Sequence, residues 1–137
     1  MRAVLADTFY WVALTNPADS HYQDAGALDD LLIGASIYTT DEVLAEFLTF
    51  FAGNAWLRNR AAQTVLLLLQ DPDVHVIPQS RESFLAGLEL YRQRPDKSYS
   101  LTDCISMQTM HRHGITEALT NDHDFEQEGF HVLFRDS

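Results

Sequence analysis

Four acidic side chains occupy positions where the fold could gather them around a metal ion. Asp7 ends the apolar run "AVLAD", and Asp122 follows "EALT" near the end of the chain. Asp103 follows the polar segment "RPDKSYS", and Glu46 lies within "DEVLAEF". Hard divalent cations prefer carboxylate oxygens, and a bound cation relieves the repulsion between clustered acids. Such a site can orient a water molecule and neutralise charge on a phosphodiester.

Each of these acids also has an ordinary structural explanation. Aspartates after strands form turns or cap helices, and Asp103 could simply complement a helix dipole. However, Asp103 shares a helical stripe with Met107 and Met110, so it also points partly inward. Four acids in compatible positions are harder to explain by turn chemistry than any one of them.

Glu46 has a competitor one turn earlier on the same predicted helix, Glu42. At about 100° per residue, Glu46 lies about 40° from Phe50, at the border of the buried arc. Glu42 lies further toward solvent on the same wheel. We therefore expect Glu46, rather than Glu42, to be the ligand.

Apolar patterning predicts strands that alternate with helices. Strands are expected at 3–7, 35–40, 74–78, 117–120 and 130–134, and helices at 20–34, 41–53, 55–70, 80–93 and 101–114. The N-terminal segment is interpreted as a first core strand rather than a signal peptide, and Asp19 or Ser20 as the cap of the first helix. The alternation predicts a single-domain α/β three-layer sandwich over residues 1–137, with a mostly parallel central sheet flanked by helices. Sites in such folds lie at the carboxyl ends of strands, where Asp7 and Asp122 are expected.

The composition is that of a soluble globular chain, with 137 residues, 46% hydrophobic and 21% charged. It has no apolar run long enough to span a bilayer, so no membrane partner is expected. A single cysteine, Cys104, excludes an internal disulfide framework and favours the cytoplasm. The net charge of −11, with Lys97 as the one lysine, argues against nucleic-acid binding through phosphate contacts alone. It favours a cationic partner or acids clustered around metal, although most of the acids are expected to be solvated surface.

Other kinds of chemistry fit the sequence poorly. His111 and His113 diverge on a helix, and no histidine has a zinc-ligand spacing. Cys104 is expected to be a core residue rather than a nucleophile. A phosphoaspartate phosphatase would have an acid at the position of Phe9, and a receiver domain would have a lysine on a late strand, whereas Lys97 lies in a loop.

Four segments of the chain follow one another in a recognisable order: "LADTFYWVAL", "TTDEVLAEF", "SLTDCISMQTMHRHGI" and "ALTNDHDFEQEGFHVL". With them, the sequence resembles PIN-domain ribonucleases of the VapC toxin type over nearly its whole length. The family pattern is an acid after the first strand, then T-x-x-V-L-x-E, S-L-x-D and T-x-D-x-x-F followed by G-F. The corresponding acids here are Asp7, Glu46, Asp103 and Asp122.

This resemblance implies that these four acids are catalytic and bind Mg²⁺ or Mn²⁺. It implies an endoribonuclease that cleaves single-stranded or looped RNA with a metal-activated water. It also implies a homodimeric toxin neutralised by a small antitoxin whose basic tail enters the cleft, and the net charge of −11 suits such a tail. The alternative is a PIN-like binding module that is non-catalytic or acts in RNA processing.

Supporting roles follow from the same resemblance. Thr8 and Thr120 match hydroxyl positions that could orient a ligand carboxylate or a metal-bound water. Phe9 stands where many relatives carry Ser or Asn, so one polar support is missing. Asp124 is expected to cap the "FEQEG" turn or to reach the metal through water, so that Asp122→Asn abolishes cleavage and Asp124→Asn only reduces it.

The cations Arg92, Arg94 and Lys97 lie just before Asp103. They are the best candidates in the sequence for contacts to RNA phosphates. The alternative for Arg92 and Arg94 is that they complement the dipole at the end of a helix.

Overall fold

The structure is a computed structural model that describes residues 2–134, so residues 1 and 135–137 of the predicted domain lie outside the described residues. Its centre is a five-stranded sheet with the order β3-β2-β1-β4-β5, in which all neighbouring strands pair parallel. The strands are β1 (Ala3–Ala6), β2 (Ser36–Thr40), β3 (Val74–Ile77), β4 (Glu117–Leu119) and β5 (His131–Val132). The helices are α1 (Thr8–Thr15), α2 (Tyr22–Leu31), α3 (Asp41–Phe50), α4 (Ala55–Leu68), α5 (Arg81–Gln93), α6 (Leu101–His113) and α7 (His123–Gln127). The predicted α/β sandwich with a parallel sheet is confirmed.

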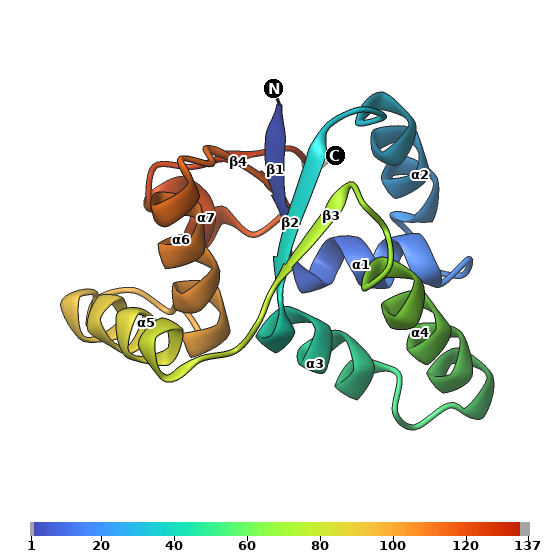
Figure 1. Ribbon diagram of the computed structural model, residues 1–137, viewed down its shortest axis with the longest axis horizontal. Coiled ribbons are helices and arrows are strands. Elements are labelled where there is room, and N and C mark those ends of the chain that lie inside the picture. The colour runs from blue at the N-terminus through green and yellow to red at the C-terminus, as the bar shows by residue number, and fades with distance from the viewer. Residues whose placement is uncertain (1, 135–137) are drawn as a thin grey trace.

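Each face of the sheet carries its own apolar core. Val4 and Ala6 of β1 face the core that includes α1, α3 and α4, whereas Leu5 between them faces the core of α5, α6 and α7. This alternation follows from the two-residue period of side chains along a strand. Figure 1 shows α1 to α4 grouped on one side of the sheet and α5 to α7 on the other. The structure therefore has the three layers that the sequence predicts.

The strand order reverses beside β1. The chain builds β1, β2 and β3 in one direction across the sheet, and then places β4 and β5 on the opposite side of β1. The crevice between β1 and β4 at their carboxyl ends is thus a topological switch point, the usual place for a site in an open parallel sheet. Asp7 follows β1 directly, and its backbone N–H donates to the carbonyl of Leu119 at the end of β4.

The N-terminal segment differs from the prediction. The first strand ends at Ala6, and the residues from Thr8 to Thr15 form helix α1, which the sequence analysis missed. Tyr10, Trp11 and their neighbours are buried, so α1 is covered on nearly all sides. A helix without a polar face lacks the 3.6-residue alternation by which helices are recognised in a sequence.

Other boundaries move by only a few residues. Helix α2 begins at Tyr22, and its N-cap is His21 rather than the predicted Asp19 or Ser20. The Asp19 carboxylate accepts a hydrogen bond from the backbone N–H of His21, in the turn before the helix. The strand expected at 130–134 is limited to β5. Gly114 ends α6 as predicted, with a φ of 66° in the left-handed region that suits glycine. Among the residues described, no helix combines the length and apolar character needed to cross a bilayer.

Candidate metal centre

Three carboxylates converge beside the switch point. Asp103, Asp122 and Asp124 each offer one oxygen atom, and these atoms lie within 4.8 Å of one another. Asp103 comes from the first turn of α6, whereas Asp122 and Asp124 come from the start of α7. All three side chains are half-buried. Oxygen ligands at this separation suit a hard divalent cation such as Mg²⁺ or Mn²⁺.

The start of α6 is fixed by a capping box. The Ser100 hydroxyl accepts from the backbone N–H of Asp103 at 3.0 Å, and the Asp103 carboxylate accepts from the backbone N–H of Ser100 at 3.1 Å. Met107 and Met110, on the same stripe, are fully buried, which agrees with the inward orientation predicted for Asp103. Asp103 therefore both stabilises the start of α6 and belongs to the carboxylate cluster. The sequence had left these two roles as alternatives.

The start of α7 corrects the roles expected of its two aspartates. Asp122 is the N-cap, and its carboxylate accepts from the backbone N–H of Asp124 at 2.9 Å. The prediction that Asp124 caps this turn is wrong, because the helix begins at His123 and Asp124 already lies inside its first turn. The side chain of Asp124 instead belongs to the three-carboxylate cluster.

Asp7 is tied to this cluster through a single hydroxyl. Its carboxylate, 6% exposed, accepts a hydrogen bond from Thr120 Oγ1 at 3.1 Å. The same Thr120 oxygen accepts from the backbone N–H of Asp122 at 3.2 Å. Glu46 Oε1 accepts at 2.6 Å from Oγ1 of Thr8, the residue that follows Asp7. Both threonines singled out in the sequence thus donate to a carboxylate of the predicted set.

The acids influence one another electrostatically. Burial raises the pKa of Asp7 to about 7, with further increases from the charges of Asp103 and Glu46. Burial also raises the pKa of Asp103 to about 6, and the nearby charges of Asp122 and Asp124 add to this. The pKa of Asp124 is likewise raised, first by burial and then by the charge of Asp122. Without a cation, ionising this group is costly, and a bound cation would remove much of that cost.

The exposure of the two glutamates of α3 is the reverse of the helical-wheel prediction. Glu46 is exposed and Glu42 is half-buried. Glu42 lines a cavity of about 560 Å³ with Gln79, Ser80, Arg81 and Phe84. These residues follow β3 and partly cover the start of α3, which a wheel of α3 alone does not reveal. Nevertheless, it is Glu46 that contacts the residue next to Asp7.

The three cations proposed for RNA each have an acidic partner. Arg92 pairs with Glu89 at 3.0 Å, and Lys97 lies 3.6 Å from Asp96. Arg94 pairs with Glu128 at 2.9 Å, and Glu128 is a residue that the sequence analysis missed. No local pattern connects positions 94 and 128, so no sequence signal announces this pair. Burial and the charge of Asp122 raise the pKa of Asp124, and the positive charge of Lys97 offsets a small part of this rise. Lys97 therefore acts electrostatically on one carboxylate of the cluster.

The remaining candidates for chemistry lie apart from the cluster. Cys104 is fully buried as a free thiol, and burial raises its pKa to about 11. It therefore stays protonated at neutral pH, as expected of a core residue. His111 and His113 are exposed, and no histidine belongs to the cluster found within residues 2–134.

Comparisons with known proteins agree with the observed fold. The family model described as "PIN domain" matches residues 4–130. Among solved structures, Mycobacterium tuberculosis VapC20, described as a toxin that cleaves the sarcin–ricin loop, has a TM-score of 0.83 and 24% identity, covering 93% of this chain and 95% of its own. VapBC2 from Rickettsia felis, bound to a DNA fragment from its promoter, has a TM-score of 0.68 and 15% identity, covering 95% and 96%. FitAcB from Neisseria gonorrhoeae has a TM-score of 0.68 and 19% identity, covering 96% of each chain. A search of curated protein sequences gives no significant match.

Proposed function

The chain belongs to the PIN-domain family, and from this membership we propose that it is a metal-dependent endoribonuclease. The observation that carries the proposal is the convergence of Asp103, Asp122 and Asp124 at the switch point of the sheet. Asp7 is linked to Asp122 of this cluster through Thr120, and Glu46 accepts a hydrogen bond from Thr8, the residue next to Asp7. The donor set consists of carboxylate oxygens, the chemistry expected for Mg²⁺ or Mn²⁺.

We assign two roles to the acids of the site, cation binding and proton transfer. Asp103, Asp122 and Asp124 would hold the cation, which when bound would lower the pKa of a water molecule and neutralise phosphate charge. Asp7 is the carboxylate suited to accept a proton from the attacking water, because Thr120 links it to Asp122 although it is not one of the three clustered acids. Thr120 keeps Asp7 oriented, and Thr8 does the same for Glu46.

RNA is the substrate we propose. VapC20, which shares the fold over 93% of this chain, is described as cleaving the sarcin–ricin loop. A looped or single-stranded RNA exposes its phosphodiesters more fully than a regular duplex, and loops are the usual targets of sequence-specific RNA recognition. Lys97, whose charge offsets a small part of the rise in the pKa of Asp124, is the candidate for a phosphate contact.

A protein partner is the second component of the proposal: we infer a toxin held inactive by an antitoxin with a basic segment. VapBC2 and FitAcB share this fold. In the present chain, the ends of α2 and α4 expose Leu31, Ile33 and Leu67, each at least two-thirds accessible, and Ile33 lines a cavity of about 230 Å³ between the two helices. Apolar exposure of this kind marks protein interfaces, and the net charge of −11 suits a basic partner.

A homodimer is also proposed. Phe50 and Trp56, on either side of the α3–α4 turn, are exposed although most aromatic residues of the chain's "FYW" and "FLTFF" runs are buried. Exposed aromatic residues are enriched at the centres of protein interfaces.

The nuclease proposal is tested with purified protein and a labelled RNA that contains single-stranded and looped segments. We expect cleavage with Mg²⁺ or Mn²⁺ and none with EDTA. Asp103→Asn should lower the rate by a factor on the order of 10² to 10³, as when a charge-stabilising group is removed. Asp24→Asn, an exposed aspartate of α2 outside the cluster, is the matched control. Cleavage that survives EDTA or Asp103→Asn would contradict the proposal, and RNA binding without cleavage would indicate the non-catalytic alternative.

A further inference from the structure

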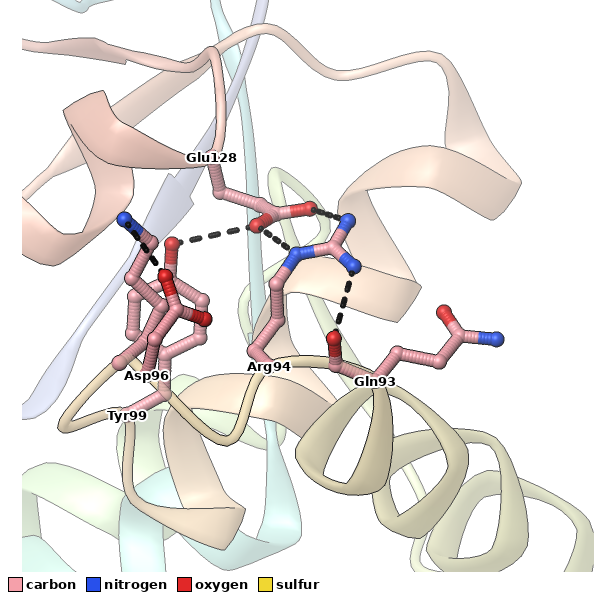
Figure 2. Close-up of polar contacts among 6 residues, drawn as sticks. Gln93, Arg94, Asp96, Tyr99 and Glu128 are labelled. Carbon is pink, nitrogen blue, oxygen red and sulfur yellow. Dashed lines mark hydrogen bonds and ion pairs between the residues drawn. The ribbon is translucent and has the colours of Figure 1, made fainter.

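A partly buried ion pair joins the loop before α6 to the end of α7. Arg94 Nε donates to Glu128 Oε1 at 2.9 Å, and Arg94 Nη2 donates to Glu128 Oε2 at 2.9 Å. The hydroxyl of Tyr99 donates to Glu128 Oε1 at 3.1 Å. Figure 2 shows the Glu128 carboxylate descending from the α7 segment onto the planar end of Arg94, with Tyr99 approaching from the side. Three hydrogen bonds therefore converge on one carboxylate.

The charges and burial of this trio favour a fixed arrangement. The side chain of Glu128 is only 8% exposed, and the hydrogen bond from Arg94 lowers its pKa, so it stays ionised. Burial raises the pKa of Tyr99 to about 12, so its hydroxyl keeps the proton that it donates. Two parallel N–H donors also fix the orientation of the Glu128 carboxylate relative to the Arg94 guanidinium, whereas a single hydrogen bond would leave it free to rotate.

The trio connects the two segments that supply the clustered carboxylates. Residue 99 is followed by Ser100, the residue whose side chain and backbone hold Asp103 in the capping box. Glu128 directly follows α7, the five-residue helix that carries Asp122 and Asp124 at its start. Tyr99 and Phe125, the buried residue of α7, belong to the same apolar core. The polar link and the apolar contact thus act on the same pair of segments.

We propose that Arg94, Tyr99 and Glu128 are positioning residues of the metal centre, which hold α7 against the start of α6. This inference rests on the proposed function, because it takes the carboxylate cluster to be a cation site. Mg²⁺ demands a near-ideal octahedral arrangement of ligands at fixed distances. A short helix with one buried side chain has little other packing to prevent small shifts, and such shifts change the separations between the oxygens of Asp103, Asp122 and Asp124.

The chain supplies a matched control for this ion pair. Arg2 donates to Glu117 through the same two nitrogens, at 2.9 and 3.1 Å. Glu117 begins β4, so this second pair lies at the amino ends of the strands, opposite the cluster. A variant of Glu117 loses a similar bidentate contact without touching either segment that carries the carboxylates.

The test measures Mn²⁺ binding by the free protein, without RNA, through the electron paramagnetic resonance of unbound Mn²⁺. We expect Glu128→Gln to weaken Mn²⁺ binding on the order of 10-fold, the effect typical of groups that orient metal ligands. Tyr99→Phe should weaken it by a smaller factor, and Glu117→Gln should leave it unchanged. The thermal unfolding midpoint of each variant is recorded in EDTA. Because the ligands of Glu128→Gln remain intact, saturating Mn²⁺ should restore its rate of RNA cleavage toward that of the wild type.

The outcomes separate this inference from the proposed function. If the wild type binds Mn²⁺ and Glu128→Gln binds it equally well, the positioning role is overturned while the nuclease proposal stands. A lower unfolding midpoint with unchanged Mn²⁺ affinity would likewise overturn it, since it would reveal a contribution to stability alone. Weaker Mn²⁺ binding in Glu128→Gln without any RNA cleavage by the wild type would uphold the positioning role and reject the nuclease. A wild type that binds no Mn²⁺ would reject both.

Discussion

Thr120 donates a hydrogen bond to the buried carboxylate of Asp7 at 3.1 Å, although 113 positions separate the two residues in the chain. The same hydroxyl oxygen accepts from the backbone N–H of Asp122. One small side chain thereby aligns the ends of β1 and β4 across the crevice where the strand order reverses. The placement of Asp7 relative to the cluster depends on this contact.

Replacing Thr120 with valine should change both stability and the pH dependence of activity. Thr120→Val keeps the shape but removes the donor, and a buried group left unsatisfied costs about 1–3 kcal/mol. Because the hydrogen bond lowers the pKa of Asp7, its loss should raise that pKa further. The acidic limb of the pH–rate profile should therefore move to higher pH. The exposed Thr116→Val serves as control, and a profile that does not move would contradict the role assigned to Thr120.

The two aspartates of α7 should differ when each is changed to asparagine. Asparagine caps helices as well as aspartate does, so Asp122→Asn should retain the hydrogen bond to the N–H of Asp124 and nearly the full stability. It removes a charge from the cluster, so cleavage should be lost. Asp124→Asn should only reduce cleavage, because Asp122, unlike Asp124, holds the acid position of the family pattern T-x-D-x-x-F and is linked to Asp7 through Thr120. Cleavage rates, Mn²⁺ affinities and unfolding midpoints of the two variants test this, and equal losses of activity would contradict it.

The metal-free protein should become less stable as pH rises from about 4 to about 7. Burial raises the pKa of Asp7 to about 7 and that of Asp103 to about 6, whereas an unfolded aspartate titrates near pH 3.9. Across this window the folded state binds more protons than the unfolded state, so the free energy of unfolding falls with rising pH and levels off above it. Each pKa unit corresponds to about 1.4 kcal/mol, so the effect is expected to reach a few kcal/mol.

Unfolding midpoints in EDTA at pH 5 and pH 8 test this dependence. Asp7→Asn should flatten it, because that variant removes the more strongly shifted group. Mn²⁺ should stabilise the wild type at pH 8, since a cation that binds only the folded state adds to its stability. Midpoints in EDTA that are the same at both pH values would show that the buried acids do not titrate as described.

Close packing of α5 on α6 should make Gly87 intolerant of a side chain. A Cβ atom there would overlap the side chain of Ile105 and approach its backbone nitrogen to 3.2 Å. Gly87→Ala should therefore cost about 1–3 kcal/mol, as overpacking does. Gly26→Ala in α2 meets no atom within 4 Å and should instead stabilise by about 0.5–1 kcal/mol. Denaturant unfolding of the two variants gives the comparison, and equal stabilities would contradict it.

Local patterns in the sequence are enough to predict the parallel sheet and most of the helices, and they single out Asp103 and Asp122, two of the three acids that cluster. A continuous apolar run marks β1, and motif spacing marks Asp103 and Asp122 as candidates. Helix α1 escapes such patterns because it is buried on nearly all sides. Its residues carry the apolar signature of a strand as well as of a core helix, and periodicity alone does not separate the two.

The finer features of the site depend on geometry that no local pattern contains. Whether Asp122 or Asp124 caps α7 depends on the residue at which a five-residue helix begins. The pairing of Arg94 with Glu128 depends on how two distant segments meet. The sequence presents Arg94 as a free cation near Asp103, whereas in the fold its donors are already engaged, and its availability to RNA phosphates is correspondingly reduced.

The central place of β1 has a consequence for synthesis. Translation delivers Asp7 more than a hundred residues before Asp122, yet β1 and β4 are neighbours in the finished sheet. A chain still being synthesised therefore contains Asp7 before Thr120 and Asp122 exist, even when its first helices have already folded. The carboxylate cluster therefore cannot form until β4 and Asp122 have been synthesised, which delays any cleavage and leaves a partner that interval in which to bind.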